Sequence, residues 1–213
     1  MNEQTRRSRG RPAVSSRADI ERAAMALFAE HGFSATTIPM IASASGVSRT
    51  SVFRYWGSKS DIVWAEFDEH IAALAQLLTD RTDTADATMD IVRRSVVENL
   101  DRSIHASSLW RERFTLIDSS DELRSEEARR WLAWASVIAD FVAHRHAIDP
   151  ADPVPQSVGG AVQGAFVAVL RAQLSGPRTD TVLSALDHVL NDVGSLIQGW
   201  LYTKTALGTN TPH

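Results

Sequence analysis

Apolar residues recur at intervals of three and four along most of this chain, and no sustained alternation of apolar and polar residues is present. This spacing is typical of amphipathic helices, whereas half-buried strands alternate at every second residue. Ile20, Ala24 and Phe28, for example, share one face of a helix that Gly32 would end. The pattern therefore predicts an all-α fold.

Polar residues that favour helix starts divide the pattern into segments. Ser16, Thr37, Ser48 and Ser58 each stand at the start of such a segment, where a helix N-cap is placed. A proline-rich stretch at 149–155 predicts a loop. The expected helices span residues 16–31, 37–45, 48–56, 58–78, 84–104, 107–118, 121–147, 156–175 and 180–204.

Composition excludes several classes of protein. The chain of 213 residues has no cysteine, so disulfides and thiolate metal sites are excluded. It has no run of 18 apolar residues, so we expect no membrane span, and its charged N-terminus does not resemble a signal peptide. We therefore expect a cytoplasmic protein.

Charge is distributed unevenly along the chain, although its net charge is only −4. Residues 1–60 hold nine Lys or Arg and four Asp or Glu, a net charge of +5, whereas the remainder has a net charge of −9. A basic end on an acidic body is typical of a protein that binds nucleic acid through that end.

The most informative segment is 33–59, which reads FSATTIPMIASASGVSRTSVFRYWGSK. Two short helices separated by Gly46 have the layout of a helix-turn-helix, in which the second helix enters the major groove of DNA. Val47, Val52 and Trp56 would pack inward, and the polar residues between them would face outward. Double-stranded DNA is therefore the leading partner.

With its flanks from Ala23 to Ile62, this segment resembles the DNA-binding signature of the TetR family of bacterial regulators. The resemblance implies nine or ten helices, a homodimer, and a small-molecule pocket in the C-terminal domain. Members are usually repressors that a ligand releases from the operator. We accordingly expect a basic arm at 1–15, a helix-turn-helix domain at 16–57, and a ligand-binding and dimerisation domain at 58–206.

A second likeness covers the stretch FRYWGSKSDIVWAEFDEHIAALAQLL. It is similar to actinobacterial regulators of the same family that are linked to the mycofactocin redox-cofactor system. This likeness implies an acyl thioester as the ligand.

The expected DNA contacts lie on and around the second short helix. Arg49 could pair with O6 and N7 of a guanine, and hydroxyl, phenol and ammonium groups nearby could hold phosphates. A solvated helix face is the alternative interpretation. The candidate set is Thr37, Ser48, Arg49, Thr50, Ser51, Phe53, Tyr55 and Lys59.

Two residues depart from the family pattern. Phe53 stands where a tyrosine is common, so it lacks the phenolic hydrogen bond and could instead contact a thymine methyl or a sugar. Pro39 stands where some members have a polar or basic contact. We therefore do not expect the first short helix to read bases.

The N-terminal arm contains Arg9-Gly10-Arg11-Pro12, which resembles the core of an AT-hook. In that motif arginines enter the narrow minor groove of A·T-rich DNA. Arg9 and Arg11 are therefore candidate minor-groove or phosphate contacts. A solvated charged tail is the alternative.

Aromatic residues are abundant after the helix-turn-helix, where five of the six tryptophans lie. They occupy segments that line the ligand pocket in the family, and they could wall a cavity for an elongated, mainly apolar effector, such as an acyl thioester or a polycyclic compound. Plain core packing is the alternative. The candidates are Trp64, Phe67, Trp110, Phe114, Trp131, Trp134 and Ile138.

The last two expected helices favour a dimer seam. One carries a row of small residues that permits close helix approach, and the other carries an apolar stripe, so two copies could form a four-helix interface. Packing within one chain is the alternative. The candidates are Gly160, Gly164, Ala168, Leu186, Val189 and Val193.

Three functions are compatible with these features: a ligand-released regulator, an enzyme that uses the C-terminal cavity, and an architectural DNA binder without a ligand. No nucleophile elbow, phosphate-binding loop or dinucleotide fingerprint is present, so we expect no catalytic residue and no cofactor. His188 and Asp192 could share a helix face, but one such pair is too little for a metal site. The regulator is the function that the sequence favours.

Overall fold

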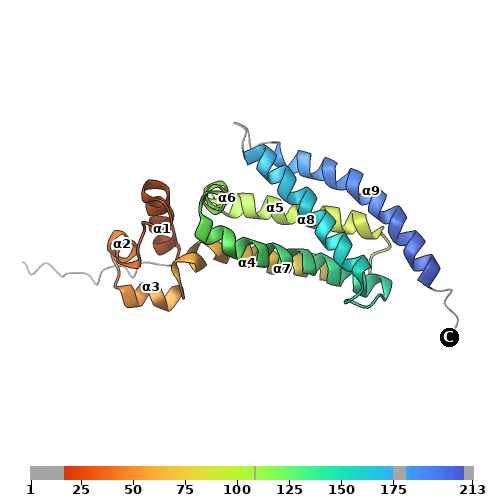
Figure 1. Cartoon of the computed structure of the whole chain (residues 1–213), viewed down its shortest axis with the longest axis horizontal. Helices are drawn as coiled ribbons and strands as arrows, with labels where there is room; N and C mark the ends of the chain where they lie inside the picture. Colours follow the sequence, from red (N-terminus) through yellow and green to blue (C-terminus); the bar gives the residue numbers. More distant parts are fainter. Residues whose placement is uncertain (1–16, 108, 175–180, 209–213) are drawn as a thin grey trace, which may run out of the picture. The chain divides into compact units, whose positions relative to one another are not determined.

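The computed structural model describes residues 17–107, 109–174 and 181–208, and these residues form nine α-helices and no strand (Figure 1). They fall into two compact units that divide between Ile62 and Val63. The all-α fold predicted from the sequence is therefore confirmed. None of the helices in these ranges is both long and apolar enough to cross a membrane.

The first unit is built from three short helices and the start of a fourth: α1 (Arg17–His31), α2 (Ile38–Ala44), α3 (Arg49–Tyr55) and α4 (Lys59–Thr79). Ile20, Phe28, Ile41 and Val52 are buried and form its small apolar core. Gly32 ends α1 with a φ of +82°, a left-handed conformation that glycine adopts without steric cost.

The second unit is a helical bundle. It contains the rest of α4 and five further helices: α5 (Thr88–Ala106), α6 (Trp110–Ser119), α7 (Asp121–His146), α8 (Pro153–Leu174) and α9 (Val182–Gly208). Helix α8 packs against α7 and α9, and α9 also packs along α5 (Figure 1).

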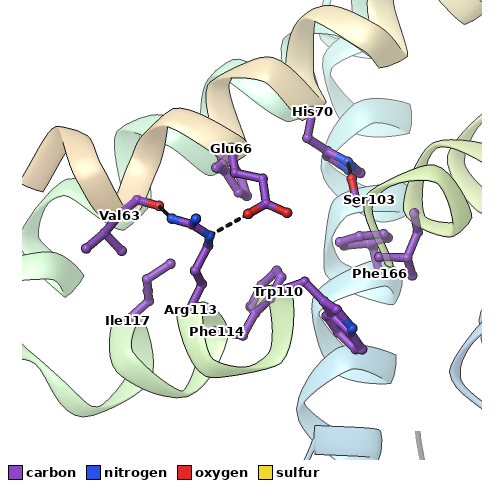
Figure 2. Close-up of a pocket in the computed structure, with 11 residues that line it drawn as sticks. Val63, Glu66, His70, Ser103, Trp110, Arg113, Phe114, Ile117 and Phe166 are labelled. Carbon is purple, nitrogen blue, oxygen red and sulfur yellow. Dashed lines mark hydrogen bonds and ion pairs between the residues drawn. The ribbon is translucent and has the colours of Figure 1, made fainter. Parts of the chain in front are cut away.

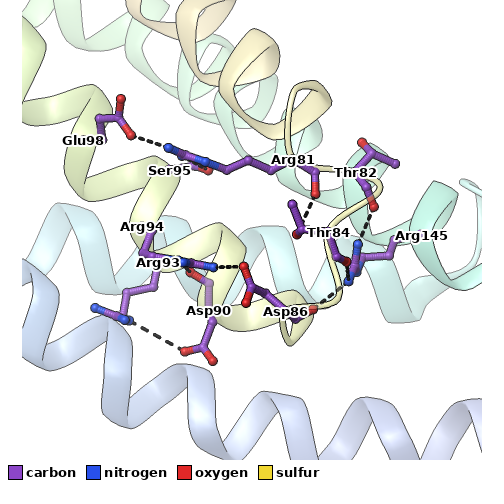
Figure 3. Close-up of polar contacts among 10 residues, drawn as sticks. All are labelled: Arg81, Thr82, Thr84, Asp86, Asp90, Arg93, Arg94, Ser95, Glu98 and Arg145. Atoms are coloured by element: carbon purple, nitrogen blue, oxygen red, sulfur yellow. Dashed lines mark hydrogen bonds and ion pairs between the residues drawn. The ribbon is translucent and has the colours of Figure 1, made fainter.

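The loop between α4 and α5 is longer than the sequence pattern predicted. Helix α5 begins at Thr88, not at residue 84, because the side chain of Arg145 binds the preceding backbone. Its guanidinium donates to the carbonyl oxygens of Thr82 at 2.5 Å, Thr84 at 2.8 Å and Asp86 at 2.6 Å (Figure 3). These hydrogen bonds tie the loop to the end of α7.

Further ion pairs join α5 to the same loop and to α9. Arg81 donates to Ser95 Oγ at 2.9 Å and to a Glu98 oxygen at 2.5 Å, and the hydrogen bond from Arg81 lowers the pKa of the Glu98 carboxyl (Figure 3). Arg93 pairs with Asp187, which joins α5 to α9.

Three other expected boundaries were also wrong by three or four residues. Helix α8 begins at Pro153, inside the stretch expected to be a loop, because the first helical turn does not need the amide that proline lacks. Asp152 supplies the cap, since its Oδ1 accepts from the Val154 amide at 2.8 Å. Helix α6 starts later than expected, at Trp110, and α9 continues to Gly208.

Gly159 permits a close approach between α7 and α8. A Cβ atom at this position would lie 2.3 Å from the carbonyl oxygen of Ala135, a backbone atom that cannot rotate away. Its neighbour Gly160 is exposed, and a Cβ there would meet nothing within 4 Å. The two glycines therefore have different roles although they are adjacent.

We predict that Gly159→Ala lowers the free energy of unfolding by about 2–3 kcal/mol, because α7 and α8 must separate to admit the methyl group. Gly160→Ala is the matched control and should be neutral or stabilising by about 0.5–1 kcal/mol, since alanine favours helices. Urea denaturation followed by circular dichroism measures both. Equal stability of the two variants would contradict the close approach.

Candidate nucleic-acid interface and apolar cavity

Helices α2 and α3 are joined by a tight turn, and each has a capped N-terminus. Thr37 Oγ1 accepts from the Met40 amide at 3.4 Å, and Ser48 Oγ accepts from the Ser51 amide at 3.1 Å. Gly46 lies in the turn with a φ of +68°. Because both helices are short, these caps account for a large share of their backbone hydrogen bonding at the N-terminal ends.

Helix α3 has a buried side and an exposed side. Val52 is fully buried, and Trp56, directly after the helix, is buried as well. The exposed side contains most of the residues expected to contact DNA and one that the sequence pattern did not single out, Arg54. The exposed residues are Ser48, Arg49, Thr50, Phe53, Arg54 and Tyr55.

The charge of this surface favours a polyanion. Residues 31–60 contain Arg49, Arg54 and Lys59 and no Asp or Glu. Arg49 forms no ion pair with any residue that the structure describes. An exposed arginine without a carboxylate partner can pair with a base edge or a phosphate at no cost in broken salt bridges.

Several polar groups on α3 already have partners inside the chain. The hydroxyls of Ser48 and Ser51 are 3.0 Å apart, and Ser48 also caps the helix. The Arg54 guanidinium lies over the Tyr55 ring, 4.9 Å from its centroid, and donates to the Tyr55 hydroxyl at 3.4 Å. Ser48 and Ser51 therefore stabilise the helix directly, whatever else they contact.

Lys59 does not extend from this surface as a free cation, because it is bound to backbone atoms. Its Nζ donates to the carbonyl oxygens of Phe33 at 2.6 Å and Thr36 at 3.1 Å, and it lies 4.1 Å from the centroid of the Phe33 ring. Thr36 is buried and donates to the carbonyls of Leu27 and Gly32. Lys59 therefore fixes the turn between α1 and α2, a role that sequence reasoning missed because the partners are backbone atoms.

Arg9 and Arg11 lie outside the described residues.

The second unit contains a small apolar cavity with a volume of about 40 Å³, which is lined by residues of α4, α5, α6 and α8 (Figure 2). Of the residues expected around a ligand, Phe67, Trp110 and Phe114 line it. Leu100 and Phe166 also belong to its apolar wall. The volume can hold one or two water molecules and is too small for an elongated ligand in this conformation.

The other aromatic candidates belong to the core beside the cavity. Trp64, Trp134 and Ile138 are fully buried and do not line it. Trp131 stacks edge-on against Phe67, with ring centroids 4.8 Å apart. Periodicity could not separate lining from packing here, because both roles place aromatic residues on the inner face of a helix.

An ion pair forms the polar side of the cavity. Arg113 is buried, and its Nε donates to Glu66 at 2.5 Å while its Nη1 donates to the Val63 carbonyl at 3.1 Å (Figure 2). The carboxylate neutralises the guanidinium inside the wall. The cavity therefore presents an apolar surface with no unpaired charge from this pair.

His70 lies at the other end of the cavity wall. Its Nδ1 and Ser103 Oγ share a hydrogen bond of 2.8 Å, and Asn99 donates to the His70 carbonyl at 2.9 Å (Figure 2). Burial lowers the pKa of His70 to about 4, so the imidazole is neutral at pH 7. The sequence pattern singled out neither Glu66 nor His70 as part of a lined cavity.

The small-residue row on α8 is exposed. Gly160, Gly164 and Ala168 lie four residues apart, and a Cβ at either glycine would meet nothing within 4 Å. The row therefore offers a flat surface on which another helix could pack closely.

The expected seam residues on α9 divide between two environments. Val189 and Val193 are half-buried, whereas Leu186 is fully buried inside the chain and offers no surface to a second copy. Leu196 and Trp200 are exposed on α9, and their spacing of four residues places them on one face.

No group of three metal-binding side chains lies together anywhere in the part of the chain that the structure describes. His188 and Asp192 are 3.5 Å apart on the surface of α9, and two such side chains are too few for a metal site.

Two family models match the chain. The model for the tetR family of bacterial regulatory proteins matches residues 20–65, and the model for the MftR C-terminal domain matches residues 86–198. The second match alone covers more than half of the chain.

One relative is the Mycobacterium tuberculosis protein MftR, to which transcriptional regulation of mycofactocin biosynthesis is ascribed. It is 31% identical over 173 residues, which are 81% of this chain and 79% of that protein.

Solved structures show the same fold at lower identity. SmeT, the repressor of the Stenotrophomonas maltophilia multidrug efflux pump SmeDEF, superposes with a TM-score of 0.61 at 18% identity, over 86% of this chain and 90% of that one. Thermus thermophilus FadR, a transcriptional repressor solved with lauroyl-CoA, superposes with a TM-score of 0.56 at 19% identity, over 84% of this chain and 93% of that one.

We predict that Lys59→Met lowers the stability of the first unit by about 1–3 kcal/mol, because two carbonyl oxygens lose a charged donor. Arg49→Met is the matched control and should change stability by less than about 0.5 kcal/mol, since that side chain is exposed. Hydrogen exchange of the amides at 33–47 measures the effect. Equal exchange in the two variants would show that Lys59 does not fix the turn.

We also predict that stability falls as the pH decreases from about 6.5 to about 4. The pKa of His70 is lower in the folded chain than in the unfolded chain, so the unfolded chain binds the proton first as the pH falls. The contribution of neutral His70 to the free energy of unfolding is therefore complete above pH 6.5, and roughly 3 kcal/mol of it is lost at pH 4. His70→Gln should remove this part of the slope, whereas the exposed His105→Gln should not. The pKa of His146 is also lowered, by burial and by Arg145, so the test compares variants and not a single curve. Identical slopes for wild type and His70→Gln would refute the assignment.

Proposed function

Because this chain belongs to the TetR family of bacterial regulatory proteins, we propose that it is a repressor that binds a palindromic operator as a homodimer and leaves it when a small molecule binds. Its family makes it a transcriptional regulator and not an enzyme. The observation that carries the proposal is the exposed, basic face of α3 behind a capped turn.

The DNA contacts follow from this face. We propose that α3 enters the major groove and that Arg49 pairs with a guanine, since it is exposed and has no carboxylate partner among the described residues. Thr50 lies beside it, and Thr37 and Tyr55 would hold phosphates. Arg9 and Arg11 would add minor-groove or phosphate contacts from the arm. Ser48, Ser51 and Lys59 would act mainly by holding α3 and its turn in place.

A dimer would form through α8 and α9. Gly160, Gly164 and Ala168 permit close contact with another helix, and Leu196 and Trp200 supply exposed apolar surface. Burying such surface is the main source of affinity between copies. Two-fold symmetry in the protein then requires two-fold symmetry in the operator.

The ligand would be mainly apolar and would enlarge the cavity as it binds. Its wall contains Phe67, Trp110 and Phe114, while Glu66 and Arg113 neutralise each other. An added charge would therefore find no unpaired partner there. The ligand would be an acyl thioester, whose chain would enter the enlarged cavity, or a polycyclic compound. FadR with lauroyl-CoA and SmeT with triclosan provide precedents on the same fold.

Helix α4 provides the physical route from ligand to DNA. Lys59, Val63, Glu66 and His70 follow one another at helical spacing, so the anchor of the α1–α2 turn and the cavity wall share a helix. A ligand that displaces Glu66 or His70 would shift α4. Induction requires tighter ligand binding to the DNA-free conformer, because equal affinity would shift nothing.

Selection of random duplexes by the full-length protein tests the function. We predict enrichment of a palindrome whose affinity falls steeply with salt, and relaxed specificity at one position in each half-site for Arg49→Ala. If no sequence is enriched at low salt, the proposal is wrong.

The dimer supplies the control for this experiment. Gly164→Glu should give monomers that lose the selected operator by at least about tenfold, because a charge would be buried in the seam. Gly164→Ala keeps a small side chain and should remain dimeric. Sedimentation at micromolar concentration distinguishes the two, and a monomeric wild type would contradict the seam.

We predict that acyl-CoA thioesters or polycyclic compounds release the operator and quench tryptophan fluorescence. Leu100→Trp narrows the cavity and should abolish the release while it preserves operator affinity within about threefold. Leu132→Trp is the matched control, since Leu132 is exposed on α7, and should behave like wild type. Fluorescence anisotropy of labelled operator measures the release. The ligand proposal fails if compounds bind and operator affinity never changes.

A further inference from the structure

Phe53 is a large apolar side chain on the exposed side of α3, and 53% of its surface is accessible to solvent. Its ring has no aromatic or cationic partner among the residues that the structure describes. Leaving a phenyl ring in water is unfavourable unless a partner covers it. A partner that covers this ring would therefore gain affinity from it.

The surroundings of Phe53 indicate what kind of partner fits. Arg49 and Thr50 lie four and three residues before it and share its helix face. All three are exposed, and no acidic residue occurs between residues 31 and 60. The face suits a polyanion that also offers an apolar group.

The major groove of DNA offers one such group. Base edges present hydrogen-bond donors and acceptors there, and the only apolar group is the C5-methyl of thymine. A phenyl ring cannot hydrogen-bond with the donors and acceptors of the base edges. We infer that Phe53 determines operator specificity by covering the C5-methyl of one thymine in each half-site, an inference that rests on the proposed function.

The size of the effect follows from the size of the methyl group. Burying one such group changes affinity by about fourfold, so removing it from both half-sites should weaken binding about fifteenfold. This change is measurable, and it is smaller than the loss expected when a charged pair is broken.

Deoxyuridine tests the inference, because it differs from thymidine only by the missing methyl. In the selected operator, each thymine is replaced in turn by deoxyuridine, symmetrically in both half-sites, and the Kd of the full-length protein is measured at fixed salt. We expect one methyl-sensitive position for wild type and none for Phe53→Ala. Phe53→Leu keeps apolar surface and should retain part of the sensitivity. Leu132→Ala, which removes an exposed apolar side chain from α7, should leave the sensitivity unchanged.

The outcomes separate this inference from the proposed function. An enriched operator without any methyl-sensitive position would overturn the inference and leave the repressor intact; it would indicate that Phe53 covers a sugar. Equal sensitivity in wild type and Phe53→Ala would also overturn it, because another side chain would then read the methyl. Failure to enrich any operator would contradict the proposed function itself, and the inference with it. Because Phe53 is exposed, Phe53→Ala should fold like wild type, which circular dichroism checks.

Discussion

The Lys59 ammonium, bound to the carbonyl oxygens of Phe33 and Thr36, is the contact on which the arrangement of the first unit depends. It ties the first residue of α4 to the turn that precedes α2, and α3 follows α2 through a link that Gly46 and Ser48 shape. Three short helices have little apolar surface of their own, so a charged donor on backbone carbonyls contributes a substantial part of their order. The Lys59 contact therefore helps to position the exposed face of α3.

In the second unit, charged groups lie beside an apolar cavity. Arg113 and Glu66 neutralise each other in its wall, and His70 remains neutral because burial opposes its protonation. The ion pair between Glu66 and Arg113 thus holds α4 and α6 together and leaves an apolar surface for a ligand. Such a wall favours uncharged groups over anions, since an anion would have to displace Glu66 from its partner.

Much of this architecture could be predicted from the sequence. Helical periodicity and N-caps gave the all-α fold, and the turn at Gly46 located α2 and α3. Contacts distant in sequence could not be predicted: Arg145 delays the start of α5 by binding loop carbonyls, and Lys59 binds the backbone. Periodicity also placed Trp134 and Phe114 on inner helix faces alike, although one packs in the core and the other lines the cavity. Only the packed structure distinguishes these roles.

Methylation interference on the operator tests the central claim, that α3 reads the major groove from two symmetric subunits. Dimethyl sulfate methylates guanine at N7, in the major groove, and adenine at N3, in the minor groove. The account predicts that methylated guanines block binding at two symmetry-related positions, separated by a whole number of helical turns. Interference confined to one half of the site, or to adenines alone, would contradict it.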